Sequence, residues 1–380
     1  MNSILKKINC ERLYLISISI LVFMYVTKMA YNYPFKYYNY FLLGLRLVAY
    51  LLVGIKFICD VIGKKYSLKE LTAIFIIGIY MLVVSYQSKT MGYMTYFIYI
   101  VTSKGVNYNT VIKFVLLSFI VSTAFVLILT AFGIIKDHIY SLNIRNRHGL
   151  GFNWTTVFPN MFMYMTLYLI YIRKTKISLF EVLIVISVAF FCYKMTDTKS
   201  AFVLTVLGIL LAYFLKYNKF LQKYHKIYNY IALGLPILMA SLIIIVSYLY
   251  NSDNMVLSKI NSILSGRLSL GRNAINEFGF TFMARTLPLV GGEPVDGNAY
   301  NFVDSSFLLY LLNFGIIFFI LLMALLEYFA SLINLKKDTH MLLVFCVFII
   351  HSTFDPQLLN LCFNYFLLVL SYKITKINNT

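Results

Sequence analysis

The sequence predicts an all-α polytopic membrane protein with about 12 transmembrane helices. Of its 380 residues, 61% are hydrophobic and only 12% are charged, whereas a soluble domain has about 25% charged residues. The mean hydropathy is +0.79. The apolar residues form long continuous runs, which distinguishes them from the alternating strands of an outer-membrane barrel. This composition excludes a soluble enzyme, a disordered chain and a disulfide scaffold.

Twelve apolar runs between polar breaks are the predicted spans. In chain order they are 13–31, 40–62, 70–86, 90–102, 112–135, 157–172, 177–194, 200–216, 227–250, 305–331, 340–353 and 357–372. The fourth and the last two are short for a full crossing, so the number twelve is approximate. No small-residue cleavage site follows the first run, which is therefore predicted to be a retained helix. All of residues 1–380 are assigned to one integral membrane domain.

The distribution of basic residues predicts the orientation of these spans. The net charge is +19, and every segment assigned to the cytoplasmic side has at least two basic residues. The short outer connections 32–39 and 87–89 have one each, and 354–356 has none. This follows the positive-inside rule, so both termini are predicted to be cytoplasmic. We therefore expect the basic residues to interact with the lipid bilayer, and we expect no nucleic acid partner.

Two predicted outer segments, 136–156 and 251–304, are too long to be plain turns. Five of the six prolines lie outside or at the outer edge. Irregular backbone is tolerated there because it can reach water or line a cavity, so the functional site is expected on this face. The sequence has no HxxxH, HExxH or Cys/His cluster, no P-loop and no GxGxxG. Neither a protein-bound metal nor another cofactor is predicted.

The first outer loop, 136–156, has the composition of an anion cradle. Arg145, Arg147 and His148 lie beside Gly149 and Gly151. Arginine offers a fork of donors that fits phosphate, and glycine lets the backbone approach closely. The alternative is that these basic residues rest on lipid headgroups.

The large loop, 251–304, contains Arg267, Arg272 and Arg285 and ends at Asp304, directly before the tenth span. It has four basic and five acidic residues. This balance argues against a polybasic lipid-binding patch. It favours individually placed arginines, with carboxylates available as bases or sugar ligands. The alternative is that arginine–carboxylate pairs hold the loop together.

Smaller polar groups occur at the ends of other spans. Asn160 opens the sixth span, and Asp197 and Lys199 share a short outer turn in which they can pair with each other. His351 and Asp355 have the four-residue spacing of one helix face, but Pro356 makes a continuing helix doubtful there. Inside the second span lie two cations, Arg46 and Lys56, both able to snorkel toward a membrane surface.

Together these segments resemble the bacterial O-antigen and capsular polysaccharide polymerases, the Wzy family of oligosaccharide repeat unit polymerases. Three features carry the resemblance, and they follow one another in the chain: Arg147…Gly151-Phe152…Pro159-Asn160, the turn Asp197-Thr198-Lys199-Ser200-Ala201, and the stretch from Gly266-Arg267 through Gly291 to Asp304…Leu308…Gly315-Ile316. In three respects the chain departs from the family. The spacer between Phe152 and Pro159 is longer than usual. Lys199 stands where the family often has arginine, and Asp304 stands where the related O-antigen ligases have a histidine.

The resemblance implies a membrane glycosyltransferase of the GT-C type in the bacterial cytoplasmic membrane. Its substrates would be undecaprenyl-pyrophosphate-linked oligosaccharide repeat units, joined into O-antigen or capsule on the outer face. Partners of the same pathway would be a flippase and a chain-length regulator. Two alternatives stay open: a ligase-like glycan transferase, or a lipid-linked oligosaccharide flippase or other transporter.

The expected mechanism begins when an acceptor hydroxyl attacks the donor's anomeric carbon and displaces the lipid pyrophosphate. Arginines placed around the leaving group would stabilise its charge, and the chosen residues are Arg147, Arg267 and Arg272. Asp304 or His148 would accept the hydroxyl proton. Substrate binding is assigned to four further residues: Arg145, Arg285, Lys199 and Asn160.

Overall fold

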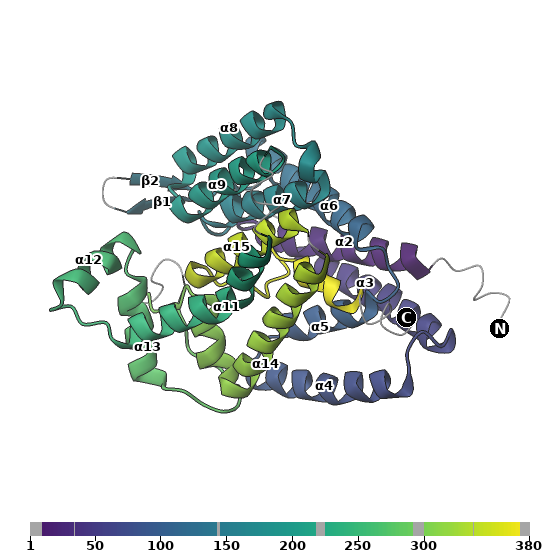
Figure 1. The fold of residues 1–380 in the computed structure, drawn as a ribbon. Helices are drawn as coiled ribbons and strands as arrows, with labels where there is room; N and C mark the ends of the chain where they lie inside the picture. Colours follow the sequence, from purple (N-terminus) through teal and green to yellow (C-terminus); the bar gives the residue numbers. More distant parts are fainter. Residues whose placement is uncertain are drawn as a thin grey trace. The chain divides into compact units, whose positions relative to one another are not determined.

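The computed structural model describes residues 10–33, 35–142, 145–217, 225–291, 300–336 and 338–372. Within these ranges the chain forms thirteen α-helices, two 3-10 helices and one two-stranded hairpin (Figure 1). Seven helices are long and apolar enough to cross a membrane. The structure is thus almost entirely helical, in agreement with the predicted all-α class of multi-pass membrane protein. Lys6, Lys7 and both chain ends, on which part of the orientation rests, lie outside the described residues.

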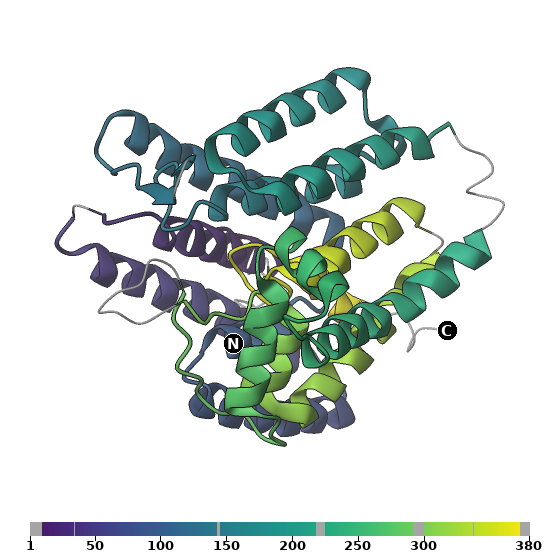
Figure 2. The same cartoon turned by 90° about the vertical axis from the view of Figure 1, so that its left-hand side faces the viewer.

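Eleven of the twelve predicted spans coincide with an α-helix. In chain order these helices are α2 (Cys10–Lys28), α3 (Tyr38–Ile62), α4 (Leu68–Gln87), α5 (Gly92–Thr102), α6 (Tyr108–Ala131), α7 (Val157–Arg173), α8 (Leu179–Thr196), α9 (Lys199–Leu215), α11 (His225–Tyr248), α14 (Ser306–Lys336) and α15 (Thr339–Phe354). The seven candidate spans belong to α2, α3, α4, α6, α8, α11 and α14. Figures 1 and 2 show α2 and α3 side by side as an antiparallel pair.

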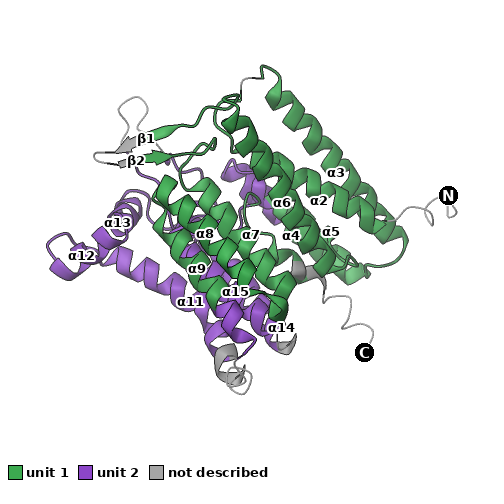
Figure 3. Ribbon diagram, turned by 90° about the horizontal axis from the view of Figure 1, so that it is seen from above, with its two compact units in different colours: residues 1–79, 94–210, 361–380 green, residues 80–93, 211–360 purple. Residues whose placement is uncertain are grey.

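The chain divides into two compact units, each assembled from separate stretches of sequence (Figure 3). Unit 1 comprises residues 1–79, 94–210 and 361–380, and unit 2 comprises residues 80–93 and 211–360. Each of the two long outer segments belongs to a different unit, so the residues predicted to act together are described below unit by unit.

In unit 1, the first outer loop folds as a hairpin of β1 (Ile139–Leu142) and β2 (Arg145–His148). The loop then pairs with the end of α2: the Tyr31 amide donates to the Gly151 carbonyl and the Asn153 amide to the Met29 carbonyl, both at 2.8 Å. Gly151 has φ +83°, and a Cβ there would lie 1.9 Å from the Thr130 hydroxyl. Only glycine permits this close approach.

The predicted twelfth helix, 357–372, is wrong. Residues 355–365 are not helical, and only Phe366–Tyr372 forms a 3-10 helix, η2. This apolar segment is almost entirely buried, so its backbone needs partners other than water. In unit 1 the hydroxyls of Tyr168, Tyr96, Tyr108 and Ser103 donate to the carbonyls of Phe363, Asn364, Phe366 and Leu368, at 2.6, 2.8, 3.0 and 2.9 Å. Hydropathy alone cannot distinguish such a segment from a helix.

In unit 2, the large outer loop is not wholly irregular. It contains α12 (Met255–Ile263) and α13 (Arg267–Phe278). The following segment, 281–285, pairs with a break in α14 at Gly315. There the Arg285 amide donates to the Asn313 carbonyl and the Ile316 amide donates to the Thr281 carbonyl, both at 2.8 Å. A Cβ on Gly315, which has φ +81°, would lie 2.6 Å from the Phe282 carbonyl oxygen.

Within each unit, several of the helix ends predicted to face outward lie together. In unit 2 the Ser306 hydroxyl at the start of α14 donates to the Asp355 carbonyl after α15, at 2.7 Å. Beside them, α13 packs closely on the end of α11, since a Cβ on Gly271 would lie 2.7 Å from the Ser247 hydroxyl. In unit 1 the end of α2 meets the hairpin loop.

Candidate functional site

The candidate site in unit 2 is built around Arg267, the first residue of α13. Ser265 and Gly266 both have positive φ, 55° and 85°, and make the sharp turn between α12 and α13. Asn261 of α12 fixes this turn, because its Oδ1 accepts from the amides of Leu268 at 2.9 Å and Ser269 at 3.1 Å. These are amides of the first turn of α13, which lack partners within the helix. Arg267 is therefore positioned by a helix cap that the sequence encodes locally.

The Arg267 guanidinium lies between two carboxylates. Its Nε is 3.9 Å from Oδ2 of Asp304, and one Nη is 3.9 Å from Oδ1 of Asp355. Both distances exceed a hydrogen bond, so Arg267 forms a tight bidentate pair with neither carboxylate. Its side chain is 20% exposed. Arg267 is thus held by charge and still accessible to another anion.

Asp304 is held by a tyrosine as well as by Arg267. The Tyr300 hydroxyl donates toward both carboxylate oxygens of Asp304, at 3.0 and 3.1 Å. The pKa of Asp304 is raised to about 6, chiefly because the group is buried; the Arg267 charge and the Tyr300 hydrogen bond lower this pKa, and the charge of Asp355 raises it. Burial, followed by the Asp304 charge, also raises the pKa of Tyr300. A carboxyl of this kind exchanges protons close to neutral pH.

The second carboxylate, Asp355, comes with a buried histidine. His351 Nε2 lies 3.3 Å from Asp355 Oδ2, and the two residues are 0% and 5% exposed. Although α15 ends at Phe354, the extended backbone of Asp355 still places its side chain beside His351. The four-residue spacing was the only sequence signal for this pair, and Pro356 obscured it. Neither residue was assigned to the site from the sequence.

The structure uses the other two predicted arginines of this loop to hold the backbone. Arg272 donates to the Tyr248 carbonyl at the end of α11 and lies 5.1 Å from the centre of the Tyr248 ring. Arg285 donates to the carbonyls of Leu312, Phe278 and Gly279, at 3.1, 2.7 and 2.5 Å. Carbonyls at helix ends lack intrahelical partners and favour cations. These contacts join α13 to α11 and to the first half of α14, which places Arg267 and Asp304.

In unit 1, the hairpin contributes a histidine that contacts a carboxylate. His148 Nδ1 lies 2.6 Å from Asp137 Oδ2, and both side chains are partly exposed. Asp137 also accepts from the Leu150 amide at 2.7 Å. Arg147 Nε donates to the carbonyl of Thr196, the last residue of α8, at 2.8 Å. The structure therefore brings together the first two parts of the family resemblance, the hairpin and the turn after α8. The Arg145 side chain lies outside the described part.

Two further predicted residues are Lys199, which follows this turn, and Asn160, which lies in α7. Asp197 has a left-handed backbone and ends α8, and Lys199 begins α9 with its side chain exposed. The Thr198 hydroxyl between them donates to the Thr155 carbonyl at 3.4 Å, which ties the turn to the segment before α7. Asn160, in the first turn of α7, is 0% exposed. Lys199 is thus accessible to a ligand, whereas Asn160 lies in the packed interior.

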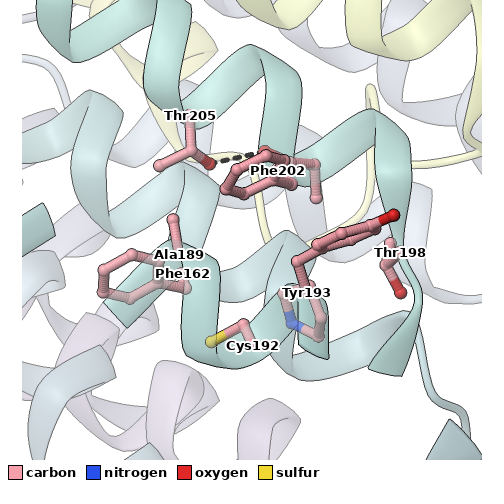
Figure 4. A pocket seen from close by; sticks show the side chains of 9 residues that line it. Phe162, Ala189, Cys192, Tyr193, Thr198, Phe202 and Thr205 are labelled. Atoms are coloured by element: carbon pink, nitrogen blue, oxygen red, sulfur yellow. Dashed lines mark hydrogen bonds between the residues drawn. The ribbon is translucent and has the colours of Figure 1, made fainter. Parts of the chain in front are cut away.

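A small crevice lies among α7, α8 and α9, next to the same turn (Figure 4). Its lining is mostly apolar and includes Pro159, Cys192 and Phe202. The Thr205 hydroxyl on its wall donates to the Ala201 carbonyl of its own helix, at 2.6 Å. The crevice therefore presents packing surface and little polar recognition chemistry.

No group of three His, Cys, Asp or Glu side chains suited to a metal occurs in the described part of the chain. The chemistry of the site in unit 2 is thus that of one guanidinium, two carboxylates, a histidine and a phenol.

We compared the chain with protein-family models, with curated proteins and with solved structures, and none of them matches it.

Proposed function

We propose that this protein is a membrane glycosyltransferase that polymerises undecaprenyl-pyrophosphate-linked oligosaccharide repeat units into O-antigen or capsular polysaccharide. The observation that carries the proposal is Arg267 between Asp304 and Asp355, where α14 begins and α15 ends. Both ends belong to the predicted outer face of the cytoplasmic membrane. A phosphate-binding group beside a titratable carboxylate is what glycosyl transfer from a lipid pyrophosphate requires.

In the proposed reaction, a hydroxyl oxygen of one lipid-linked repeat unit attacks the anomeric carbon of the growing glycan. A new glycosidic C–O bond forms, and the bond between the anomeric carbon and the pyrophosphate oxygen breaks. Asp304 accepts the proton of the attacking hydroxyl, and Arg267 stabilises the negative charge on the departing lipid pyrophosphate.

The pKa of Asp304 suits this role. A general base works best when its pKa lies near the operating pH, because it is then ionised and still basic enough to accept a proton. A pKa of about 6 meets both conditions. Arg267 suits the other role, because at 3.9 Å from either carboxylate its fork of donors can turn to a phosphate without first breaking a short hydrogen bond.

The remaining predicted residues receive separate roles. We assign Arg272 and Arg285 to positioning, since both donate to backbone carbonyls that hold α13. Arg147, His148 and Lys199 of unit 1 remain proposed contacts for the pyrophosphate or the glycan of a substrate.

One observation favours the ligase-like alternative as the second candidate. His351 lies beside Asp355 in the same cluster, so a histidine is present at the site, although in the chain the ligases' histidine corresponds to the position of Asp304. A ligase would transfer the finished glycan to an acceptor that is not a lipid-linked repeat unit.

The test is complementation of a deletion strain, with the surface glycan separated on a gel. Asp304→Asn and Arg267→Gln should leave single repeat units where the wild type forms a ladder. Asp253→Asn, an exposed carboxylate in the same loop, is the matched control and should restore the ladder. A normal ladder with Asp304→Asn and Arg267→Gln would refute the site. A deletion that removes even single units from the surface would indicate a flippase, and long chains left on the lipid would indicate a ligase.

A further inference from the structure

Helix α3 carries two cations on the face that packs into unit 1. Its buried positions are Leu42, Ala49, Val53, Lys56 and Asp60. Arg46 follows Leu42 by four residues and precedes Ala49 by three, which places it on the same stripe of the helix. Arg46 and Lys56 therefore lie on the same stripe of α3, ten residues apart, with Arg46 partly exposed and Lys56 buried, and they allow a direct comparison of how the fold treats each charge.

The protein itself compensates the charge of Lys56 fully. Lys56 Nζ lies 2.5 Å from Asp60 Oδ2 and donates to the carbonyls of Thr102 and Lys104 at the end of α5. The Lys56 side chain is 1% exposed, and Asp60 also pairs with Lys65 at 2.6 Å. Because an ammonium has three donors, this set satisfies all of them.

Arg46 has no such arrangement. Its Nε is buried without a hydrogen-bond partner, and the described residues give Arg46 neither a hydrogen bond nor an ion pair. Polar hydroxyl groups lie near it. Tyr25 of α2 lies within electrostatic range of Arg46 and of Tyr50, and the Tyr50 hydroxyl lies 2.5 Å from the Thr95 hydroxyl.

An unpaired cation within an apolar span is costly, and in membrane proteins such residues are usually compensated or functional. Arg46 lies eight residues after Tyr38, about 12 Å from the predicted outer end of α3. It is partly exposed, and its helix neighbours Leu43 and Leu47 are 50% and 55% exposed, as expected of lipid-facing residues. Arg46 is therefore reachable from the outer leaflet.

We propose that Arg46 binds the phosphate of a membrane lipid, with the hydroxyls of Tyr25, Tyr50 and Thr95 as neighbouring polar groups. The guanidinium fork matches phosphate oxygens geometrically. No described carboxylate forms an ion pair with Arg46, whereas Asp60 pairs with Lys56. This site lies in unit 1 and does not depend on the proposed glycosyltransferase activity.

The test is a lipid-dependent thermal shift of the full-length protein purified in a neutral detergent. Phosphatidylglycerol should raise the Tm of the wild type, whereas a diacylglycerol with the same chains should not. Arg46→Gln should weaken phosphatidylglycerol binding about tenfold to a hundredfold, the effect of one charge-assisted hydrogen bond. Arg46→Lys keeps the charge without the fork and should fall between the two.

The matched control is Lys56→Met on the same stripe of α3. Without added lipid, Arg46→Gln should be at least as stable as the wild type, because the fold itself provides no partner for this charge. Lys56→Met should have a lower Tm, because buried Asp60 would keep only its pair with the exposed Lys65, and should still gain stability from phosphatidylglycerol. A clear loss of Tm for Arg46→Gln without lipid would overturn the proposal, since it would reveal a protein partner.

Further probes identify the source of the phosphate. An undecaprenyl phosphate shift without a phosphatidylglycerol shift would assign the site to the isoprenoid substrate, and shifts with both would assign it to membrane lipid phosphates in general. Either result supports the proposal if Arg46→Gln abolishes it. Equal shifts in the wild type and Arg46→Gln, or a full shift with inorganic pyrophosphate alone, would overturn it. Loss of polymerisation without loss of lipid binding would count against the proposed function only.

Discussion

The pH dependence of polymerisation gives the sharpest test of Asp304 as the base. With a pKa of about 6, Asp304 is ionised at pH 7.5. The rate should fall below pH 6 by about tenfold per pH unit, as the ionised fraction falls. The neighbouring groups that set this pKa are known from the structure. Substituting one of them should therefore shift the acidic limb of the pH–rate profile, the range in which the rate falls as the pH is lowered. The direction of the shift depends on which neighbour is substituted.

Two substitutions should move the limb in opposite directions. Asp355→Asn removes a negative charge that raises the pKa of Asp304, so its limb should move to lower pH. Tyr300→Phe removes a hydrogen bond that stabilises the carboxylate, so its limb should move to higher pH. A hydrogen bond to a charged group is worth about 1.5–3 kcal/mol, or about one to two pK units. Because the Asp304 side chain is 25% exposed, we expect the lower end for both, about one unit.

The assay is the initial rate of chain extension in proteoliposomes between pH 4.5 and 8, normalised to the amount of folded protein. Lipid-linked repeat units extracted from a polymerase-deletion strain serve as substrate. Asp253→Asn should leave the profile unchanged. If the limb of Asp355→Asn moves up, if that of Tyr300→Phe moves down, or if neither moves, Asp304 is not the group that titrates in the reaction.

Three further predictions concern the framework and the charges. Asp304→Asn should raise the Tm at pH 7.5 by the equivalent of up to about 3 kcal/mol, because a pKa of about 6 makes the ionised form of Asp304 unfavourable in the folded protein. This gain in stability should shrink as the pH falls through 6 toward 4. A gain that does not depend on pH would contradict the raised pKa. Gly315→Ala should lower the Tm, since the added Cβ would lie 2.6 Å from the Phe282 carbonyl at φ +81°; an unchanged Tm would mean that the break in α14 relaxes freely. Arg147→Lys should shorten the glycan ladder at normal protein level, because lysine lacks the fork that binds Thr196 and a phosphate together; a ladder of normal length would leave Arg147 without a role in the reaction.

The sequence by itself determined the membrane class and the places of eleven helices. These follow from local quantities: a helix satisfies its own backbone bonds, so a long apolar run is sufficient to predict it in a membrane. The caps are local as well. Asn107 accepts from the Thr110 amide at the start of α6, and Ser178 and Glu181 form a capping box at the start of α8. Such signals can be read without knowing what lies across the fold.

The candidate site was predicted only in part. Arg267 and Asp304 were chosen because the balanced charge of the outer loop favours individually placed arginines, with carboxylates available as bases. Asp355 and His351 were not chosen, because Pro356 hid a contact that extended backbone makes possible. Arg272 was given a catalytic role and Arg285 a substrate-binding role, whereas in the structure both donate to backbone carbonyls. No sequence pattern shows which acceptor an arginine meets when that acceptor lies on another helix.

Tertiary structure alone decided which apolar or charged segments obtain partners from elsewhere in the chain. Residues 357–372 read as a helix, yet the hydroxyls of Tyr96, Tyr108 and Tyr168 accommodate them as buried irregular backbone. Lys56 and Arg46 read alike in one span, yet Asp60 and two carbonyls surround only Lys56. The physical reason is the same in each case. Composition fixes how much polar surface must be satisfied, whereas the three-dimensional packing fixes which group satisfies it.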